Sequence, residues 1–227
     1  MTNILCTICA RKGSKGLKNK NIKKINGKIL FLYTFEIAKK INFIDKIVVS
    51  TDSNHIKKIV GKKYSWFTRD KNLSNDKASK IDVIKDAVLK AEKKFSCKYD
   101  VILDLDVTSP LRKKKDILDS YNIFKNKNYN NLFSVTESVK NPYFNMIEVD
   151  KGKITLCKKG INYFTRQSAP TVYDMNASIY FWKRNVLFSK NPIFNKKTGI
   201  YKMPKERSFD IDNSVDFLIV KKFINAK

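Results

Sequence analysis

The sequence contains a single histidine, His55, which lies in a segment that resembles an ordinary helix. A catalytic unit of the serine–histidine or cysteine–histidine type would have to be built on this residue, and nothing near it supports one. Zinc sites that need several histidines are excluded for the same reason. The protein must therefore work without histidine chemistry.

Long apolar runs are also absent, because no segment approaches the roughly 20 residues that a membrane helix needs. Residues 1–10 form a short apolar run that Arg11 and Lys12 follow, which is the wrong order for a secretory signal. We interpret this run as a buried first strand. The sequence thus predicts a cytoplasmic protein without a membrane partner.

The four cysteines do not form a recognisable site. Cys6 and Cys9 are three residues apart on the expected first strand, so their side chains point to opposite faces. No second pair of ligands accompanies them, and Cys97 and Cys157 are isolated. We interpret all four as reduced thiols of a cytoplasmic protein.

Acidic residues are few relative to basic ones, with 21 against 47, which gives a net charge of +26. Such a charge raises the alternative of a basic nucleic-acid-binding module. However, the excess is mostly lysine, it is spread along the whole chain, and the aromatic residues fall on core stripes. We favour a solvated basic surface, part of which steers a polyanionic substrate, and we expect no nucleic-acid partner.

Apolar periodicity alternates between strands and helices along most of the chain. We predict strands at 4–9, 46–50, 64–68, 101–105 and 132–135, and helices at 30–41, after the capping residue Ser53, at 81–95 and at 116–124. This order predicts an α/β fold: a mostly parallel sheet with helices on both faces, in a single domain spanning 1–227. Ligands should bind beyond the carboxyl ends of the strands.

The alternation loosens between residues 140 and 176. There we predict a hairpin of 143–149 and 153–158 around Lys151 and Gly152, followed by a return strand at 176–182. The last predicted helix, 214–224, should turn Val215, Leu218, Ile219 and Phe223 inward.

The loop after the first strand combines two glycines, Gly13 and Gly16, with several cations. Glycines let backbone N–H groups approach a ligand closely, and cations beside them make an anion site. The spacing is not that of a Walker A loop. The loop predicts phosphate binding, with a plain basic surface loop as the alternative.

Paired acids occur at two other places. Asp104 and Asp106 share a sheet face, and Asp210 and Asp212 flank Ile211 so that both carboxylates point one way. Oxygen ligands of this kind suit Mg²⁺. The alternatives are solvated acids beside a helix capped by Ser109, and a structural role for Asp212 at the last helix. Phosphate binders and paired acids without a nucleophile favour metal-assisted displacement at phosphorus.

These segments together resemble the CMP-nonulosonate synthetases, which include the CMP-sialic acid and CMP-legionaminic acid synthetases. Residues 10–21 resemble the family's Ala-Arg-x-Gly-Ser-Lys-Gly-x-x-x-Lys-Asn signature. Further matches, in the same order, are Arg69 with Leu73 and Asp76, then 108–112, 166–167, 176–180 and 210–212. The resemblance covers nearly the whole chain and implies a Rossmann-like nucleotidyltransferase fold.

The resemblance also implies transfer of CMP from CTP to the anomeric hydroxyl of a nine-carbon acidic sugar, with release of pyrophosphate. The implied catalytic residues are Arg11, Lys15, Lys20, Asp210 and Asp212, of which Asp210 and Asp212 bind Mg²⁺. The implied nucleotide-binding residues are Arg11, Lys12, Gly13, Ser14, Lys15, Lys20, Asn21, Arg69, Ser74 and Asp76. The implied sugar-binding residues are Asp106, Thr108, Ser109, Lys140, Arg166, Gln167, Asn176 and Tyr180.

The resemblance further implies a homodimer built by the insertion at 140–176, which helps to close the sugar site. Related acidic sugars, pseudaminic acid and Kdo, remain alternative substrates. One departure from the family is Asp106-Val107, where Gln-Pro is frequent. Because an aspartate accepts but does not donate, we hypothesise that Asp106 joins a metal site or meets a cationic substituent or hydroxyl of the sugar. This would favour a modified sugar such as legionaminic acid over N-acetylneuraminic acid.

Overall fold

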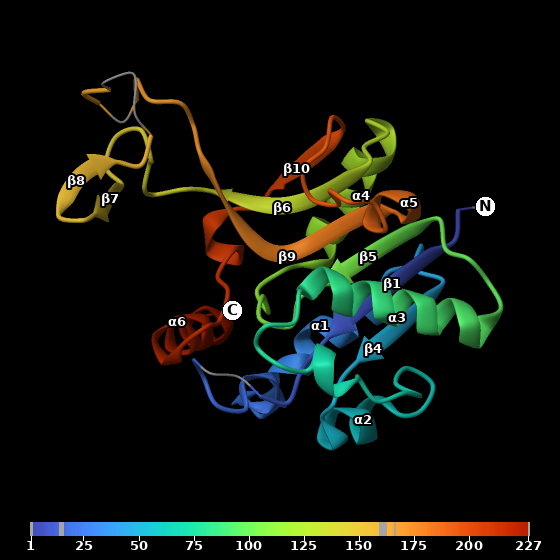
Figure 1. Cartoon of the computed structure of the whole chain (residues 1–227). Coiled ribbons are helices and arrows are strands. Elements are labelled where there is room, and N and C mark those ends of the chain that lie inside the picture. The colour runs from blue at the N-terminus through green and yellow to red at the C-terminus, as the bar shows by residue number, and fades with distance from the viewer. Residues whose placement is uncertain (1, 14–15, 159–162, 166, 227) are drawn as a thin grey trace.

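The computed structural model describes residues 2–13, 16–158, 163–165 and 167–226. Its centre is a six-stranded sheet in the order β10-β6-β9-β5-β1-β4. The strands are β1 (Ile4–Cys9), β4 (Lys46–Ser50), β5 (Val101–Leu105), β6 (Asn131–Glu137), β9 (Tyr173–Lys183) and β10 (Thr198–Lys202). Only β9 runs antiparallel to its neighbours, β5 and β6. The predicted mostly parallel sheet is confirmed (Figure 1).

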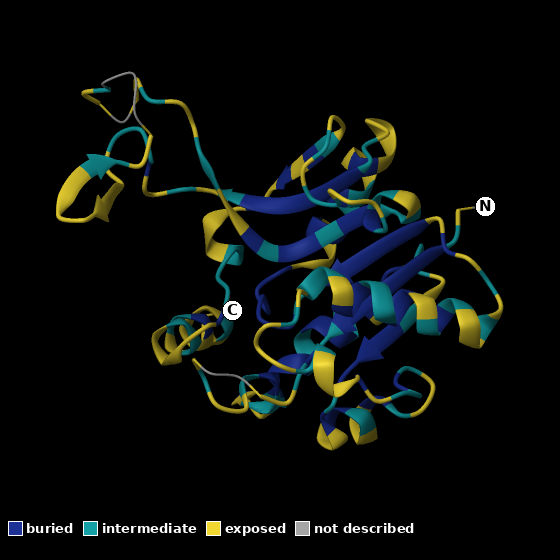
Figure 2. Ribbon diagram, in the orientation of Figure 1, coloured by how far each residue is buried: buried dark blue, intermediate teal, exposed yellow. Residues whose placement is uncertain are grey.

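Helices cover both faces of the sheet, as predicted. Because side chains alternate along a strand, Leu5 and Ile102 face α3 (Lys80–Phe95), while Cys6 and Leu103 face the layer of α1 (Leu30–Lys39) and α4 (Lys114–Asn126). The central strands β1 and β5 are buried along almost their whole length (Figure 2). This explains why they are mostly apolar.

Shorter elements fill the connections. They are the hairpin β2 (Lys24–Ile25) and β3 (Lys28–Ile29), the helices α2 (Asn54–Val60) and α5 (Arg184–Leu187), and the 3₁₀ turns η1 (Lys20–Ile22), η2 (Lys71–Leu73) and η3 (Lys205–Arg207). The last element is the helix α6 (Ser214–Asn225). Ser53 caps α2 as predicted, since its hydroxyl accepts a hydrogen bond from the Ile56 N–H at 3.4 Å.

Two local predictions are wrong. Residues 64–68 do not form a strand, because only the Tyr64 carbonyl pairs with β4, through the Val49 N–H at 2.8 Å, and no ladder continues. Strand β10 was not predicted at all. Its sequence, Thr-Gly-Ile-Tyr-Lys, has little apolar content, and its Gly199 is needed because a Cβ there would collide with the Tyr129 ring.

The rotation of α6 also differs from the prediction. Val215 and Leu218 are each 62% exposed, whereas Val220 is fully buried and Phe217 packs against the core. The helix carries two apolar stripes, and the sequence does not say which one faces inward. The cap decides where the helix starts: the Asn213 side chain accepts hydrogen bonds from the Val215 and Asp216 N–H groups.

The predicted hairpin is present as β7 (Ile147–Asp150) and β8 (Lys153–Leu156), with a shorter first strand than expected. Lys151 and Gly152 make its turn with positive φ angles of 47° and 81°. The hairpin stands away from the sheet (Figure 1) and is exposed over most of its surface (Figure 2). Within the described residues, no helix combines the length and the apolar content needed to span a bilayer.

Candidate active site

A cavity of about 300 Å³ lies at the carboxyl ends of β1 and β5. Its walls come from four separate segments of the chain, which are the loop after β1, the turn after β5, the segment after η2 and the segment before α6. The lining residues are Cys9, Arg11, Gly16, Lys20, Asn21, Asp76, Asp106, Thr108 and Asp212. The fold thus brings together the predicted phosphate loop and members of both acid pairs.

The loop after β1 is held by its own backbone and by neighbouring loops. Asn21 Nδ2 donates to the Arg11 carbonyl at 2.9 Å, and the Lys12 N–H donates to Asp52 at 2.6 Å. Arg11 forms an ion pair with Asp76. Arg11 and Lys20 line the cavity, while Lys12 and Gly13 are exposed. Ser14 and Lys15 lie outside the described residues.

Gly16 joins this loop to the second acid pair. A Cβ at Gly16 would collide with the Asp212 carbonyl oxygen, so only glycine allows this approach. Lys20 Nζ donates to the Ile211 carbonyl and lies 3.1 Å from Asp212 Oδ1. On the other side, the Ile211 N–H donates to the Thr108 carbonyl at 3.0 Å. The buried Ile211 therefore fixes the two aspartates that flank it.

Asp210 is the unsatisfied group of the site. Its Oδ1 is buried and has no hydrogen-bond partner among the described residues. Burial and the charge of Asp106 raise the pKa of Asp210 to about 6. A carboxylate oxygen in this state fits a divalent cation, with Asp212 as the second ligand. No cluster of three or more metal-binding side chains occurs in the described part of the chain, so substrate oxygens or water would complete the coordination.

Asp212 is not the cap of α6, because Asn213 fills that role and the Asp212 N–H donates to Asp216 at 2.9 Å. Its side chain is 76% exposed beside the cavity. Asp212 therefore lies next to both the helix terminus and the cavity, and its structural role at the last helix stays an alternative to metal binding.

The first acid pair meets a cation that the sequence did not suggest. Lys80 Nζ lies 3.0 Å from Asp104 Oδ2 and 2.6 Å from Asp106 Oδ2. Asp104 is fully buried, and its Oδ1 accepts a hydrogen bond from the Thr7 hydroxyl at 2.6 Å. These acids are not solvated, and the residue that caps α4 is Lys113 rather than Ser109.

Asp106 is held as an anion. Burial by itself raises the pKa of Asp106. The Lys80 ammonium and two hydrogen bonds from Thr108 outweigh burial and hold this pKa well below its usual range. Burial lowers the pKa of Lys80, but the two carboxylates outweigh burial and raise it well above its usual value. The pair is therefore charged at neutral pH, and Asp106 only accepts hydrogen bonds.

Four of the remaining predicted sugar residues lie in or beside the cavity walls and form two groups. Thr108 lines the cavity, and the Tyr180 ring lies 5.2 Å from Lys80 Nζ. Ser109 and Asn176 are buried and already bonded: Asn176 accepts from the Ser134 hydroxyl at 2.6 Å and donates to Ser208 at 3.1 Å. These two support the walls rather than face a ligand.

Lys140 and Gln167 lie near the projecting hairpin and do not line the cavity around Asp106. Lys140 is exposed, and Gln167 borders a separate cavity of about 290 Å³ beside Asn141. Arg166 lies outside the described residues.

The predicted cytidine residues Arg69 and Ser74 also lie off the cavity lining. Arg69 is buried, and its guanidinium donates to the hydroxyl and the carbonyl of Ser50 at 3.1 and 2.5 Å. The Ser74 hydroxyl donates to the Asp70 carbonyl at 2.9 Å. Both side chains fix the backbone beside the cavity.

Arg112, from the motif after β5, holds the wall of the site in place through its hydrogen bonds. It is buried and donates to the Asp106 carbonyl at 3.0 Å, to the Thr34 hydroxyl at 2.8 Å and to Ser178. The guanidinium thus ties the turn that carries Asp106 to β9 and α1.

Comparison with known proteins agrees with this site. The family model described as "Cytidylyltransferase" matches residues 5–226. The chain is 45% identical to post-translational flagellin modification protein B of Campylobacter coli, and 43% identical to CMP-N,N'-diacetyllegionaminic acid synthase of Campylobacter jejuni. Each alignment covers 100% of this chain and 97% of the relative.

A solved structure of CMP:2-keto-3-deoxy-manno-octonic acid synthetase complexed with CTP has a TM-score of 0.68 at 15% identity, covering 99% of both chains. That similarity supports the fold alone. Together with the two relatives, the family match confirms the resemblance inferred from the motifs. The chain belongs to the cytidylyltransferase family, and within it to the CMP-nonulosonate cytidylyltransferases.

Proposed function

We propose that this enzyme transfers CMP from CTP to the anomeric hydroxyl of a nine-carbon acidic sugar, releases pyrophosphate and requires Mg²⁺. The observation that carries the proposal is the buried, unpaired Asp210 Oδ1 in a site where Arg11 and Lys20 line the adjoining cavity. Displacement at phosphorus needs positioned cations and a metal site, and it needs no protein nucleophile.

The loop after β1 supplies the positive side of the site. Arg11 and Lys20 would contact the triphosphate, with Lys12, Gly13, Ser14 and Lys15 extending the binding surface along the same loop. Lys20 also holds the Ile211 carbonyl, so triphosphate binding and the position of the aspartates are linked through one side chain. Asn21, Arg69 and Ser74 would shape the cytidine end.

Asp210 and Asp212 would hold the cation, since they flank Ile211, whose carbonyl accepts from Lys20 and whose N–H donates to Thr108. Mg²⁺ bound there would neutralise charge on the pyrophosphate and acidify the anomeric hydroxyl. The Thr108 carbonyl accepts the Ile211 N–H at 3.0 Å and so fixes the backbone between the two aspartates.

The sugar would lie against Asp106, Thr108 and Tyr180. Its identity is best supported as a legionaminic acid, because a relative 43% identical over the whole chain is named for N,N'-diacetyllegionaminic acid. The projecting hairpin supports a homodimer. Ile147, Val149 and Ile154 are each at least 60% exposed on it, and such a surface is typical of an interface. A second copy would then bring Lys140, Arg166 and Gln167 to the sugar site.

The test is pyrophosphate release by the purified protein with Mg²⁺, CTP and a sugar panel of N,N'-diacetyllegionaminic acid, N-acetylneuraminic acid, pseudaminic acid and Kdo. ATP, GTP and UTP are the nucleotide controls. We expect release with CTP and the legionaminic acid in a reaction that EDTA stops. If no sugar gives pyrophosphate release, and the protein binds DNA or RNA tightly and in a salt-sensitive way, the proposal is overturned in favour of a nucleic-acid-binding module.

A cytoplasmic location is part of the same proposal. The four cysteines are free thiols, which fits a reducing compartment.

A further inference from the structure

We propose that Lys80 is a positioning residue that fixes Asp106 as the acceptor for a single O–H or N–H group of the substrates. The inference rests on the proposed function and adds a specificity element to it. Asp106 lines the cavity and Lys80 does not, so Lys80 acts through Asp106 rather than on the ligand.

The positive charge of Lys80 is stabilised at its position in the fold by two acidic partners. It is the first residue of α3, where the helix dipole disfavours a positive charge. The same ammonium lies within 3.0 Å of both Asp104 and Asp106, and 5.2 Å from the centre of the Tyr180 ring. One cation therefore forms ion pairs with two carboxylates at the end of β5.

Asp104 explains why this cation cannot be replaced by solvent. Its side chain is 0% exposed, and the Thr7 hydroxyl bonds only Oδ1. Removing Lys80 would leave Asp104 as an uncompensated buried charge close to a second carboxylate, which is strongly unfavourable. Asp106 would then be repelled from its present position.

The hydrogen bonds of Asp106 leave room for one more donor. A carboxylate offers about four acceptor sites. Lys80 Nζ fills one at 2.6 Å, and the Thr108 N–H and hydroxyl fill two at 3.0 and 2.8 Å. The backbone of Asp106 is fixed too, because its carbonyl accepts from Arg112 and from the Thr34 hydroxyl. One acceptor site in a rigid position remains for the cavity.

The chemistry of the ligand group follows. It is a neutral hydroxyl or amide N–H, because a carboxylate or phosphate would be repelled and a group without a hydrogen would leave the anion unpaired. Two sources carry such groups in this reaction: the ribose of CTP and the hydroxyl or acylamino groups of the sugar. The hypothesis that Asp106 is a metal ligand is not favoured, since its charge already faces Lys80.

The experiment compares Asp106→Asn, Lys80→Met and the double variant with wild type, by steady-state kinetics in both substrates. Lys90→Met is the matched control. Lys90 lies on the same helix, bridges Asp86 and Asp70 at 2.9 and 3.3 Å and lies 4.8 Å from the Phe67 ring, but is not part of the cavity.

We expect both single variants to raise KM for the same substrate by about tenfold to a hundredfold, the usual effect of losing a hydrogen bond to a charged group. The effects in the double variant should not multiply. 2′-DeoxyCTP, 3′-deoxyCTP and sugars in which one hydroxyl or acylamino group is replaced by hydrogen identify the source: wild type discriminates against the analogue that lacks the donor, and both variants lose that discrimination. Lys90→Met should match wild type.

The proposal is overturned if Lys80→Met lowers only the melting temperature and kcat, if the two effects multiply, or if Lys90→Met behaves like Lys80→Met. Crystal structures of wild type and Lys80→Met provide a readout that needs no substrate. We expect Asp106 to leave its bonds with Thr108 in the variant, and an unmoved Asp106 would overturn the positioning role. Loss of the proposed function would instead appear as wild type that is inactive with every sugar, so the two failures are distinguishable.

Discussion

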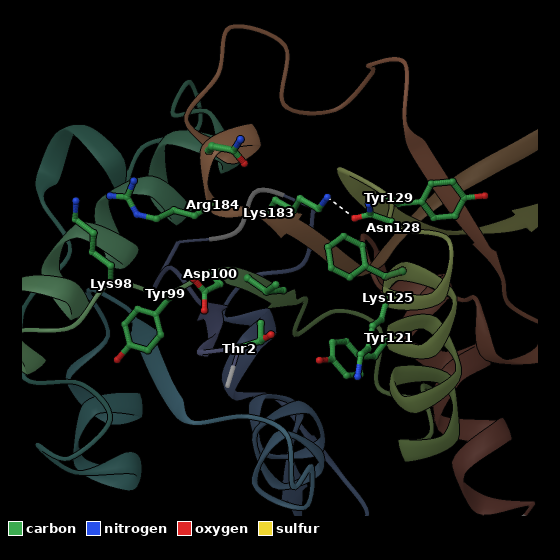
Figure 3. A pocket seen from close by; sticks show the side chains of 13 residues that line it. Thr2, Lys98, Tyr99, Asp100, Tyr121, Lys125, Asn128, Tyr129, Lys183 and Arg184 are labelled. Carbon is green, nitrogen blue, oxygen red and sulfur yellow. Dashed lines mark hydrogen bonds between the residues drawn. The ribbon is translucent and has the colours of Figure 1, made fainter.

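Strands β1 and β5 have a cavity at each end, and the larger one is at the end without the predicted motifs. About 520 Å³ lies at the amino ends of these two strands, between Tyr99, Tyr121 and Lys125 (Figure 3), against about 300 Å³ at their carboxyl ends. In the larger cavity two of the cations are already bonded. Lys183 donates to Asn128 at 2.6 Å, and Arg184 donates to both oxygens of Glu92 at 2.6 and 2.8 Å.

The smaller cavity has the opposite character. Arg11, Lys20 and Asp212 line it, and Asp210, two residues before Asp212, keeps a buried carboxylate oxygen without a partner among the described residues. The unpaired buried atom at the larger cavity is the neutral hydroxyl of Tyr99. A protein that retains an unsatisfied buried carboxylate loses stability there, which is reasonable only if a ligand completes the site. An unpaired buried carboxylate at the carboxyl ends of the strands therefore locates the site better than cavity volume does.

The largest effect should come from Asp210→Asn. The amide keeps the shape but loses the charge that would hold a cation, so kcat should fall by about 10²- to 10³-fold, as when a preorganised electrostatic group is removed. Its effect on stability should have the opposite sign. Because the folded-state pKa of about 6 exceeds the usual value, ionised Asp210 destabilises the fold above that pH. The variant should melt higher than wild type at pH 8 in metal-free buffer, and a lower melting temperature would contradict this account.

The next effect should come from Lys20→Met. Lys20 contacts the Ile211 carbonyl and Asp212, and it lines the cavity. Its removal takes a cation from the triphosphate and loosens the aspartates, so kcat/KM for CTP should fall by about 100-fold. Lys18→Met is the matched control, because Lys18 is exposed on the same loop and has no partner in the cavity lining. Equal losses in both variants would mean that the loop acts only through its net charge.

A smaller effect on activity, with a clear effect on stability, is expected for Asp116→Asn. Asp116 is fully buried under the segment that leads to Asp210, and it accepts hydrogen bonds from Arg207 at 2.8 and 3.0 Å and from Tyr201 at 3.0 Å. Breaking a buried pair of this kind costs about 3 kcal/mol. Urea unfolding at pH 7 measures the loss, and Glu206→Gln is the control because that exposed carboxylate touches the same arginine at 3.5 Å.

The pH dependence of this pair has a definite sign. Burial raises the pKa of Asp116, but the bonds from Arg207, the Lys113 N–H and Tyr201 outweigh burial and lower it. The stabilisation is therefore complete above the ordinary carboxyl pKa of about 4 and is lost as pH falls through the lower folded-state value. The difference between wild type and Asp116→Asn should shrink at pH 3, and a constant difference would contradict the ionised pair.

Features set by neighbouring residues could be predicted from the sequence, whereas features set by contacts between distant residues could not. Most of the strands follow from the apolar alternation. The phosphate loop after β1 follows from the local spacing of its glycines and lysines, and both signals act within a few residues. Asp104 and Asp106 were placed correctly on one face, because the period of a strand is two. Lys80 was missed because it is one cation among 47 basic residues, and its partners are 24 and 26 positions away. The rotation of α6 was wrong since two apolar stripes compete on one helix, and packing decides between them.

The smallest effect should come from the cavity at the amino ends. Lys98 and Lys125 line it without an ion pair in the described part of the chain, so their substitution by alanine leaves no buried charge behind. We expect kcat/KM to change by less than about twofold. The free energy of unfolding should change by less than about 0.5 kcal/mol, as for other surface substitutions. A loss of activity comparable to that of Lys20→Met would place a second functional site at the opposite end of the sheet. Unchanged kinetics, next to the large loss in Asp210→Asn, would show that unsatisfied charge rather than volume marks the active end.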